Sequence, residues 1–382
     1  MYNVLTLNKI AAVGTSCLGD NYTVSDDVQN PDAILVRSAA MHDMEFGSDL
    51  LAIARAGAGT NNIPKDKCTE QGIVVFNTPG ANANAVKELV VAGLLLSSRK
   101  IVEGIEWAKT LKGNGEAVGK MVEKGKSQFV GPELKGKTLG VIGLGAIGIL
   151  VANAAVALGM KVIGFDPFMS VPNALRLNPH IALMKNNEEV MTNCDYLTIH
   201  VPLTPETKDM VDAEMIEKMR DGVRILNYSR DGLVNTEAVL AAIKAGKVAK
   251  YVTDFGNDAI LGEENVIVLP HLGASTPESE DNCAVMACEQ VKEYIENGNI
   301  VNSVNYPAIS LARTAGDKRI CVMHKNVPEL IKKILGEISG NVENMLSKSR
   351  GEYAYTIIDV EGAIDADKIA AVEGVVRVRV ID

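Results

Sequence analysis

A glycine-rich turn between a strand and a helix constrains the fold of this chain more than any other feature. Gly143-Leu-Gly145-Ala-Ile-Gly148 follows the apolar run TLGVI and opens a helical pattern that ends near Gly159. In this arrangement two glycines permit a tight turn and the close approach of a pyrophosphate, and the third lets the helix pack on the strand. The helix N-terminus then offers unpaired N–H groups to the phosphates. The segment therefore predicts a dinucleotide-binding unit.

An acidic residue completes this pattern. The next apolar run, KVIGF, ends at Asp166. A carboxylate at this place accepts hydrogen bonds from ribose hydroxyls and repels a 2′-phosphate, so the sequence favours NAD over NADP. A glycine turn that only packs is the competing interpretation, and the presence of strand, helix and acid together disfavours it.

Composition excludes several classes of protein. The 382 residues carry a formal net charge of −10 and only 4% aromatic residues, which disfavours a nucleic-acid-binding surface. Six scattered cysteines without C-x-x-C spacing predict reduced thiols in the cytoplasm and no metal site. The uncharged stretch 140–160 is long enough to cross a bilayer, but its glycines favour a buried strand, turn and helix, so no membrane partner is expected.

Short apolar runs alternate with helical patterns over residues 1–305, which predicts parallel sheets wound with helices. One long helix is expected from Val86 to about Leu111, followed by a Gly- and Lys-rich boundary that reaches Lys137. The expected strands are 33–36, 52–55, 74–76, 138–142, 161–165, 196–200, 224–227, 251–254 and 266–269.

The C-terminal part, residues 317–382, follows a different order, and we refer to it as the tail. After a break over 297–317 that includes the run TAGD, the expected elements are strand 319–323, helix 327–339, strands 342–347 and 353–360, helix 365–372 and strand 375–381. This βαββαβ order is typical of a ferredoxin-like unit. The predicted fold class is therefore α/β, with two doubly wound parallel-sheet domains and a small ferredoxin-like tail.

Two ionisable residues follow predicted strands, at the edge where open α/β sheets bind their ligands. Arg230 follows VRILNYS, and its planar guanidinium there could hold a carboxylate by two parallel hydrogen bonds; a surface charge is the alternative. His271 follows VIVLP, and the turn that begins at Gly273 favours a ligand site over a histidine that only packs at a domain edge. His200 also ends a strand and is interpreted as a wall of the cofactor cleft.

Four segments resemble the NAD-dependent D-2-hydroxyacid dehydrogenases in order and spacing: GKTLGVIGLGAIG, HVPLTPETKDMV, LNYSRDGLVN and VLPHLGAST. The likeness extends through ILVRSAAMHD, RAGAGTNNI and VVFNTPGANANAVKEL, and the tail is similar to an ACT regulatory module. The resemblance implies a flavodoxin-like substrate domain (1–95 and 280–305), a Rossmann NAD domain (96–279) and an ACT-like regulatory domain (317–382).

The same resemblance assigns roles to residues. Arg230 is implied to bind the substrate carboxylate and His271 to be the acid–base. The family supports this histidine with a glutamate in the context D-V-F-x-x-E-P, which this chain lacks, so Asp258 is the expected third catalytic residue, with Glu263 or Glu264 as alternatives. Substrate contacts are expected at Arg37, Ser38, Asn82 and Lys9, with Arg37 as the first choice for a phosphate. Cofactor contacts are expected at Gly143, Gly145, Ala146, Ile147, Gly148, Asp166, His200, Val201, Pro202, Thr207, Asn227, Ser229, Asp254 and Gly273, and Asp254 is implied to face the nicotinamide.

The implied activity is the NAD-dependent oxidation of 3-phospho-D-glycerate to 3-phosphohydroxypyruvate, the entry to serine synthesis, by a cytoplasmic homodimer or homotetramer. Another D-2-hydroxyacid substrate, such as glycerate or lactate, and a non-catalytic NADH-sensing protein are the alternatives. In the tail, His324, Asn326 and Asn341 are implied to bind L-serine across two modules. The alternative is a tail that only joins subunits, since Glu329 stands where the family often has glycine.

Overall fold

The computed structural model describes residues 1–313 and 318–382. It divides into two units: unit 1 comprises Met1–Asn82 with Pro277–Asp382, and unit 2 comprises Ala83–Thr276. The TAGD run and the first residue predicted for the tail, Asp317, lie outside the described residues. The predicted α/β class is confirmed, with two parallel sheets and one antiparallel sheet.

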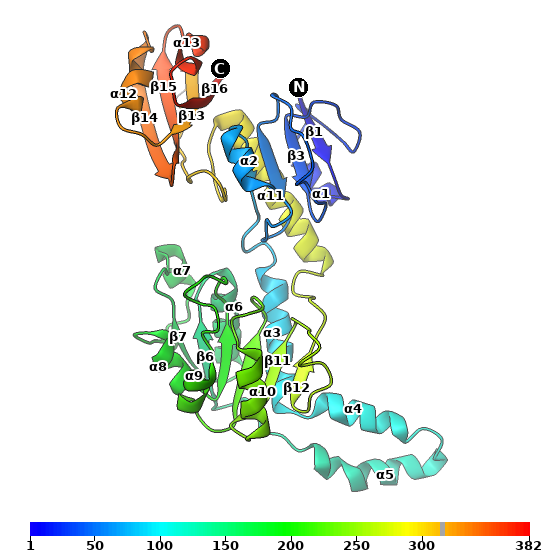
Figure 1. Cartoon of the computed structure of the whole chain (residues 1–382). Coiled ribbons are helices and arrows are strands. Elements are labelled where there is room, and N and C mark those ends of the chain that lie inside the picture. Colours follow the sequence, from blue (N-terminus) through cyan, green and yellow to red (C-terminus); the bar gives the residue numbers. More distant parts are fainter. Residues whose placement is uncertain (314–317) are drawn as a thin grey trace. The chain divides into compact units, whose positions relative to one another are not determined.

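Unit 1 contains a parallel five-stranded sheet in the order β2-β1-β3-β4-β5, the flavodoxin-like order (Figure 1). The three predicted strands of this sheet are completely or almost completely buried, because their residues, apart from Arg55 at the end of β4, are apolar and covered on both faces. The two strands that were not predicted carry polar residues between apolar ones. The strands are β1 (Tyr2–Thr6), β2 (Tyr22–Ser25), β3 (Ala33–Val36), β4 (Ala52–Arg55) and β5 (Val74–Phe76).

Three helices accompany this sheet: α1 (Ala12–Thr15), α2 (Lys65–Glu70) and the long α11 (Pro277–Asn297). Gly14 of α1 lies so close to α11 that a Cβ atom there would stand 2.4 Å from the carbonyl carbon of Ala284. The first helix is therefore held against a helix that lies far away in the sequence.

Unit 2 contains a parallel seven-stranded sheet in the order β12-β11-β10-β9-β6-β7-β8. Strand order reverses between β6 and β9, as in the Rossmann fold, and this switch point is where such sheets bind dinucleotides. The strands are β6 (Thr138–Ile142), β7 (Lys161–Phe165), β8 (Ala182–Leu183), β9 (Tyr196–Ile199), β10 (Val223–Asn227), β11 (Val248–Thr253) and β12 (Val266–Val268). The short strand β8 was not predicted.

The helices of unit 2 are α3 (Ala83–Ser98), α4 (Ile101–Thr110), α5 (Val118–Gly125), α6 (Ala146–Ala157), α7 (Val171–Arg176), α8 (Asn187–Thr192), α9 (Ala213–Lys218) and α10 (Thr236–Lys244), with 3₁₀ turns η1 (Gly115–Ala117) and η2 (Lys126–Phe129).

The single helix predicted from Val86 to Leu111 is wrong. The chain leaves the helical conformation at Lys100 (φ −72°, ψ 55°), which separates α3 from α4. Helix α3 buries one face, whereas no residue of α4 is buried, so the two helices lie in different environments. The stretch up to Lys137, predicted as a boundary, contains α5 and the two 3₁₀ turns.

The uncharged stretch 140–160 forms β6 and α6, and none of the helices in the described residues is long and apolar enough to span a membrane.

The tail forms the predicted βαββαβ unit, an antiparallel sheet in the order β14-β15-β13-β16. The helix predicted over 327–339 starts later, because Glu329 adopts a left-handed conformation (φ 63°) that a helix cannot include. The elements are β13 (Lys318–Lys325), α12 (Leu330–Gly336), β14 (Asn341–Arg350), β15 (Tyr353–Glu361), α13 (Ala366–Ala370) and β16 (Val375–Ile381).

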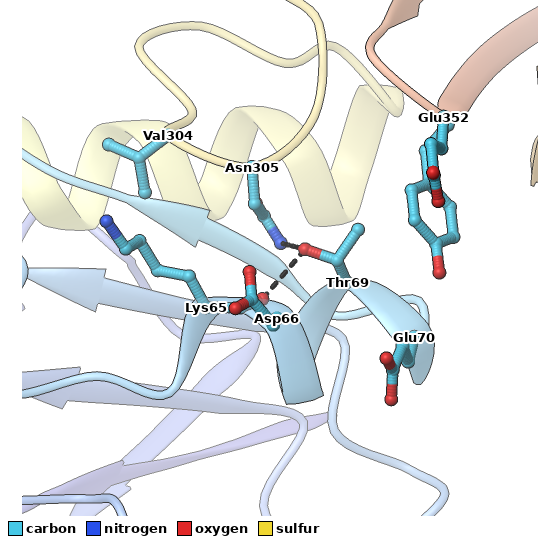
Figure 2. A pocket seen from close by; sticks show the side chains of 8 residues that line it. Lys65, Asp66, Thr69, Glu70, Val304, Asn305 and Glu352 are labelled. Carbon is cyan, nitrogen blue, oxygen red and sulfur yellow. Dashed lines mark hydrogen bonds between the residues drawn. The ribbon is translucent and has the colours of Figure 1, made fainter.

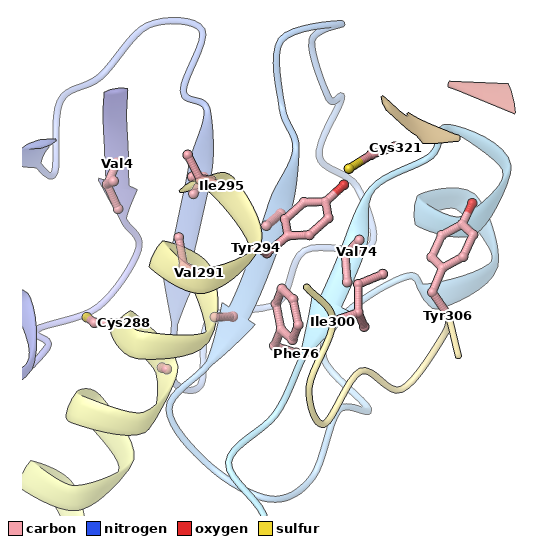
Figure 3. Packing of buried hydrophobic residues seen from close by; sticks show 14 of the residues in the cluster. Val4, Val74, Phe76, Cys288, Val291, Tyr294, Ile295, Ile300, Tyr306 and Cys321 are labelled. Carbon is pink, nitrogen blue, oxygen red and sulfur yellow. The ribbon is translucent and has the colours of Figure 1, made fainter. Parts of the chain in front are cut away.

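The two central strands of the tail sheet, β13 and β15, are buried on both faces. Along β13, Ile320 and Val322 pack with α12 and α13, whereas Cys321 and Met323 point the other way and join the core of the first sheet. This alternation is the ordinary period of a strand. Figure 3 shows Cys321 in the same cluster as Tyr294 of α11. The tail therefore shares a core with the rest of unit 1.

Two tail arginines also bind the C-terminal turn of α11. Arg379 donates to the carbonyl oxygens of Tyr294 (3.2 Å) and Ile295 (2.9 Å), and its guanidinium lies 4.7 Å from the centre of the Tyr294 ring. Arg319 donates to the carbonyl of Asn297 at 2.8 Å. The last carbonyls of a helix have no partner within the helix and carry partial negative charge, so these cations stabilise the end of α11.

Candidate active site

The glycine turn between β6 and α6 has the shape that the motif predicts. Gly143 has φ +87°, and a Cβ atom there would lie 2.5 Å from the carbonyl oxygen of His200. A Cβ atom on Gly148 would lie 1.9 Å from the carbonyl oxygen of Gly143. At Gly145, by contrast, a Cβ atom would have no heavy atom of the described residues within 4 Å. Two glycines are thus required by packing, and the third faces open space.

That open space lies at the N-terminus of α6. The helix begins at Ala146, followed by Ile147, and no side chain caps its first turn. Its first N–H groups and the positive end of its dipole are available to an anion. The residues present therefore fit the pyrophosphate of a dinucleotide, and Gly145 leaves room for it.

Asp166 lies directly after β7, beside this turn. Its carboxylate accepts hydrogen bonds from the backbone N–H groups of Leu144 (2.9 Å) and Phe168 (2.8 Å). These two bonds hold the carboxylate next to the glycine turn, and each oxygen keeps a further lone pair for a hydroxyl donor.

Strand β9 ends beside the glycine turn, and its loop is fixed by side-chain hydrogen bonds. Burial lowers the pKa of His200 to about 4, so its ring is neutral at physiological pH. Its Nε2 lies 3.0 Å from Oγ1 of Thr198. Ser229 donates to the carbonyl of Val201 (2.6 Å), and Thr207 donates to that of Pro202 (2.7 Å). The β9 and β10 loops are thereby joined at the carboxyl edge of the sheet.

Strands β10, β11 and β12 are adjacent, and each supplies one ionisable residue at its carboxyl end. Arg230 follows β10, where Asn227 donates to its backbone carbonyl at 2.9 Å. Asp254 follows β11 directly, and His271 follows β12. Nδ1 of His271 lies 3.1 Å from Oδ2 of Asp254. This contact raises the pKa of the His271 imidazole, while partial burial and the positive charge of Arg230 oppose the increase. The guanidinium and the imidazole therefore lie at the same edge of one sheet.

The carboxylate that contacts His271 in this structure is that of Asp254, whereas the sequence predicted Asp258. Asp258 lies on the exposed turn after Phe255-Gly256-Asn257, whereas Asp254 stands at the buried end of β11 next to β12. Of the two alternatives, Glu263 lies 3.9 Å from Nζ of Lys244, and Glu264 is exposed. Position in the sheet, more than spacing along the chain, decides which carboxylate reaches the histidine.

In unit 1, the predicted substrate residues gather at the carboxyl edge of the first sheet. Lys9 is exposed and lines a pocket of about 480 Å³ after β1 and β2, together with Asn8, Ser25 and Asp26. Arg37 follows β3, and its guanidinium donates to Glu280 of α11 at 2.7 Å. Exposed Ser38 follows Arg37, and half-buried Asn82 follows β5 as the last residue of this part of the unit.

Sequence reasoning missed several residues that shape these sites. The side-chain oxygen of Asn8 accepts hydrogen bonds from the backbone N–H groups of Arg37, Ser38 and Ala39 at 2.9 to 3.1 Å. In unit 2, the ring of Phe255 packs on that of His271, with centroids 5.1 Å apart. An asparagine directly after a first strand is a weak signal for such a loop anchor. The aromatic contact has no signal in the sequence.

A second cavity of about 390 Å³ lies between α2 and the tail (Figure 2). It is lined by Lys65, Asp66, Glu70 and Glu352 among others. Thr69 on its wall accepts a hydrogen bond from Asn305 (3.1 Å) and donates to the carbonyl of Lys65 (2.7 Å). The cavity holds none of the predicted site residues.

The three residues predicted to bind an effector do not meet within one chain. The ring of His324 is buried, with Nδ1 2.8 Å from the carbonyl of Lys325 and Nε2 2.8 Å from Oγ1 of Thr356. Asn326 follows the end of β13 and donates to the carbonyl of Gly351 at 3.1 Å. Asn341 starts β14, at the end of the sheet where β13 begins. A common site for these residues requires a second copy of the tail.

Comparisons with known proteins agree with this geometry. Residues 91–273 match the family described as D-isomer specific 2-hydroxyacid dehydrogenase, NAD binding domain. The chain is 33% identical over 404 residues to D-3-phosphoglycerate dehydrogenase of Mycobacterium leprae, a match that covers 97% of this chain and 74% of the relative. It is 34% identical over 313 residues to the protein of the same name from Synechocystis, covering 80% of this chain but only 54% of that relative.

Solved structures of dehydrogenases are also similar to this chain. The NAD⁺-bound 3-phosphoglycerate dehydrogenase of Entamoeba histolytica matches with a TM-score of 0.60 and 26% identity, covering 80% of this chain and 98% of the other. D-mandelate dehydrogenase of Rhodotorula graminis matches with a TM-score of 0.67 at 20% identity, which reflects the shared fold.

Proposed function

This chain belongs to the D-isomer specific 2-hydroxyacid dehydrogenase family and is an NAD-dependent dehydrogenase, and we propose that it oxidises 3-phospho-D-glycerate to 3-phosphohydroxypyruvate, the first step of L-serine biosynthesis. One observation carries the proposed site: Arg230 and His271 follow β10 and β12, the two strands that flank β11, in the same sheet as the glycine turn. We assign the cofactor to Gly145, the first turn of α6 and Asp166, which fit its pyrophosphate and ribose.

The proposed acid–base is His271. In the oxidising direction its neutral ring accepts the proton of the C2 hydroxyl as the carbonyl forms. Bound NAD supplies the acceptor for the hydride that leaves C2. In the reducing direction the imidazolium returns the proton to the carbonyl oxygen. Arg230 holds the substrate carboxylate with two parallel hydrogen bonds and stabilises charge on the C2 oxygen, which fixes the reacting carbon.

The phosphate of the substrate needs a cation, and we assign it to Arg37 and Lys9 of unit 1. Arg37 is held at its backbone by Asn8 and reaches Glu280 with its guanidinium, so phosphate binding would exchange that carboxylate for a phosphate. Lys9 lines the neighbouring pocket beside Asn8. Ser38 and Asn82 are proposed as polar contacts to the rest of the substrate.

For the tail we propose L-serine as an effector, bound across two copies, since Asn326 and Asn341 lie at opposite ends of one tail sheet. The buried, hydrogen-bonded ring of His324 and the shared core with α11 support the alternative of a tail that acts as a structural element. Calorimetry with L-serine on the wild-type chain and on Asn326→Ala distinguishes these. Heat of binding that the variant loses supports the effector; no heat and no loss of activity at millimolar serine leaves only the structural role.

We also propose a cytoplasmic homo-oligomer. All six cysteines are free thiols, which fits a reducing compartment. Helices α4 and α5 expose apolar side chains, including Ile105 (51%) and Val122 (37%), which fits a contact between subunits.

His271→Ala tests the proposed function, with His180→Ala as a matched control on an exposed histidine of the same unit. We expect His271→Ala to lose ~10²–10⁴-fold in kcat, the usual contribution of a positioned acid–base, and to keep its affinity for NADH within a few fold. Retention of near-wild-type kcat by His271→Ala would show that another group moves the proton.

A further inference from the structure

Two consecutive residues hold the imidazole of His271. Oδ2 of Asp254 lies 3.1 Å from Nδ1, and the ring of Phe255 lies against the imidazole with centroids 5.1 Å apart and planes inclined by 47°. Both residues follow β11, which pairs in parallel with β12, the strand that leads to His271. The imidazole is therefore positioned by the register of two neighbouring strands.

The two members of this pair differ sharply in exposure. The side chain of Asp254 is 1% exposed, whereas that of His271 is 62% exposed. Within the described residues, Oδ1 of Asp254 has no hydrogen-bond partner, Oδ2 has only its contact with Nδ1 of His271, and the buried hydroxyl of neighbouring Tyr228 also has no partner. A buried carboxylate that is so poorly satisfied destabilises the fold because its loss of hydration is not compensated, and such a group is typical of a functional site.

The charged groups around the imidazole define its electrostatics. Asp254 favours the imidazolium and Arg230 disfavours it, and among the described residues these two charged side chains act on His271. Tyr228 faces Asp254, and burial together with that carboxylate raises the pKa of its phenol, so it stays neutral. Asp258 and Glu264 are exposed on the loop that follows β11, and Glu263 lies near Lys244.

We propose that Asp254 is the positioning residue of His271 in this chain, in place of the glutamate that the family uses. Its Oδ2 holds the proton of His271 on Nδ1, which leaves Nε2 to exchange a proton with the substrate oxygen, and its charge stabilises the imidazolium. Oδ1 remains as an acceptor for a donor group that the bound cofactor brings. This inference rests on the proposed function for the role of His271 in turnover, but the pairing itself is testable without turnover.

A titration of His271 by NMR tests the pairing directly. The chain has five histidines, so the signal that disappears in His271→Gln identifies this residue. We expect the pKa of His271 to fall in Asp254→Asn and to stay unchanged in Asp258→Asn, which removes an equivalent charge four residues away. A fall in Asp258→Asn alone overturns the proposal. If Asp254→Asn does not fold, Asp258→Asn still decides, because an unchanged His271 titration in that variant excludes Asp258 as the partner and supports Asp254.

Kinetics add a readout that a purely structural role would not give. In the reducing direction activity requires the imidazolium, so its high-pH limb lies at the pKa of His271. Asp254→Asn should move that limb to lower pH and decrease kcat by roughly 10²-fold or more, with a smaller change in KM. Asp258→Asn should leave both unchanged.

If the wild-type chain turns over no 2-keto acid while the NMR result holds, the proposed function fails and the pairing stands. If turnover is normal and Asp254→Asn has the wild-type pH profile, the pairing fails and the proposed function stands.

Discussion

The guanidinium of Arg319 donates two hydrogen bonds to the carboxylate of Asp359, at 2.7 and 2.8 Å, and both side chains are almost completely buried in the tail. The remaining donors of Arg319 reach the carbonyl oxygens of Asn297, Leu311 and Ala312. One side chain thus connects β13 and β15 of the tail to the end of α11 and to the segment that follows it.

Removal of Arg319 should strongly destabilise unit 1. Arg319→Ala leaves the buried carboxylate of Asp359 without a partner, so we expect a loss of about 3–5 kcal/mol in the free energy of unfolding, measured by urea denaturation. The double variant Arg319→Met with Asp359→Leu removes both charges and should recover much of this loss. A single variant as stable as the wild type would contradict the role of this ion pair.

Glu329→Gly should stabilise the tail. Glu329 has φ 63°, where a side chain is strained and glycine is not. Relief of this strain stabilises the folded chain, whereas the greater freedom of glycine stabilises the unfolded chain. We expect a net increase of about 0.5–1 kcal/mol in the free energy of unfolding, measured by thermal denaturation. Glu337→Gly, in the right-handed conformation at the other end of α12, should instead lower stability. Equal effects of the two substitutions would show that the conformation of Glu329 is not strained.

The same substitution at two glycines should separate cofactor binding from folding. Gly145→Ala adds a methyl group where no heavy atom of the described residues lies within 4 Å, so the chain should fold normally but bind NADH at least about 10-fold more weakly. Gly148→Ala drives a Cβ atom into the carbonyl of Gly143, so it should lower the melting temperature as well. Fluorescence titration with NADH and thermal unfolding measure the two effects. Unchanged NADH affinity in Gly145→Ala would place the pyrophosphate elsewhere.

Stability should depend on pH through His200. Burial lowers its pKa from 6.5 to about 4, so between these values the unfolded chain binds a proton that the folded chain does not. The free energy of unfolding should therefore fall as the pH falls from 6.5 towards 4. His200→Gln should flatten this slope, which urea denaturation at several pH values measures. A slope that is the same in the variant would assign the effect to other groups, such as buried His324, whose pKa burial also lowers.

The sequence predicted those strands and motifs that depend on the local pattern of apolar, glycine and turn residues. The bounds of β3, β4, β5, β6, β7 and β16 match the predictions because each is a short, mainly apolar segment between turn residues. Pairings between distant segments could not be predicted. Asp254 rather than Asp258 reaches His271 because β11 and β12 pair in a particular register, and the contact between Arg37 and Glu280 joins residues more than 240 positions apart. The break at Lys100 has no Pro or Gly that would predict it, and it separates α3, which buries one face, from α4, which has no buried residue.

The absorbance of NADH during reduction of a panel of 2-keto acids tests the central claim most directly: that Arg230 and His271 act together on a D-2-hydroxyacid beside bound NAD. We predict that the wild-type chain oxidises NADH with 3-phosphohydroxypyruvate faster than with hydroxypyruvate or pyruvate, and that Arg230→Gln and His271→Gln each abolish most of this rate. NADH binding without turnover of any 2-keto acid would contradict the account.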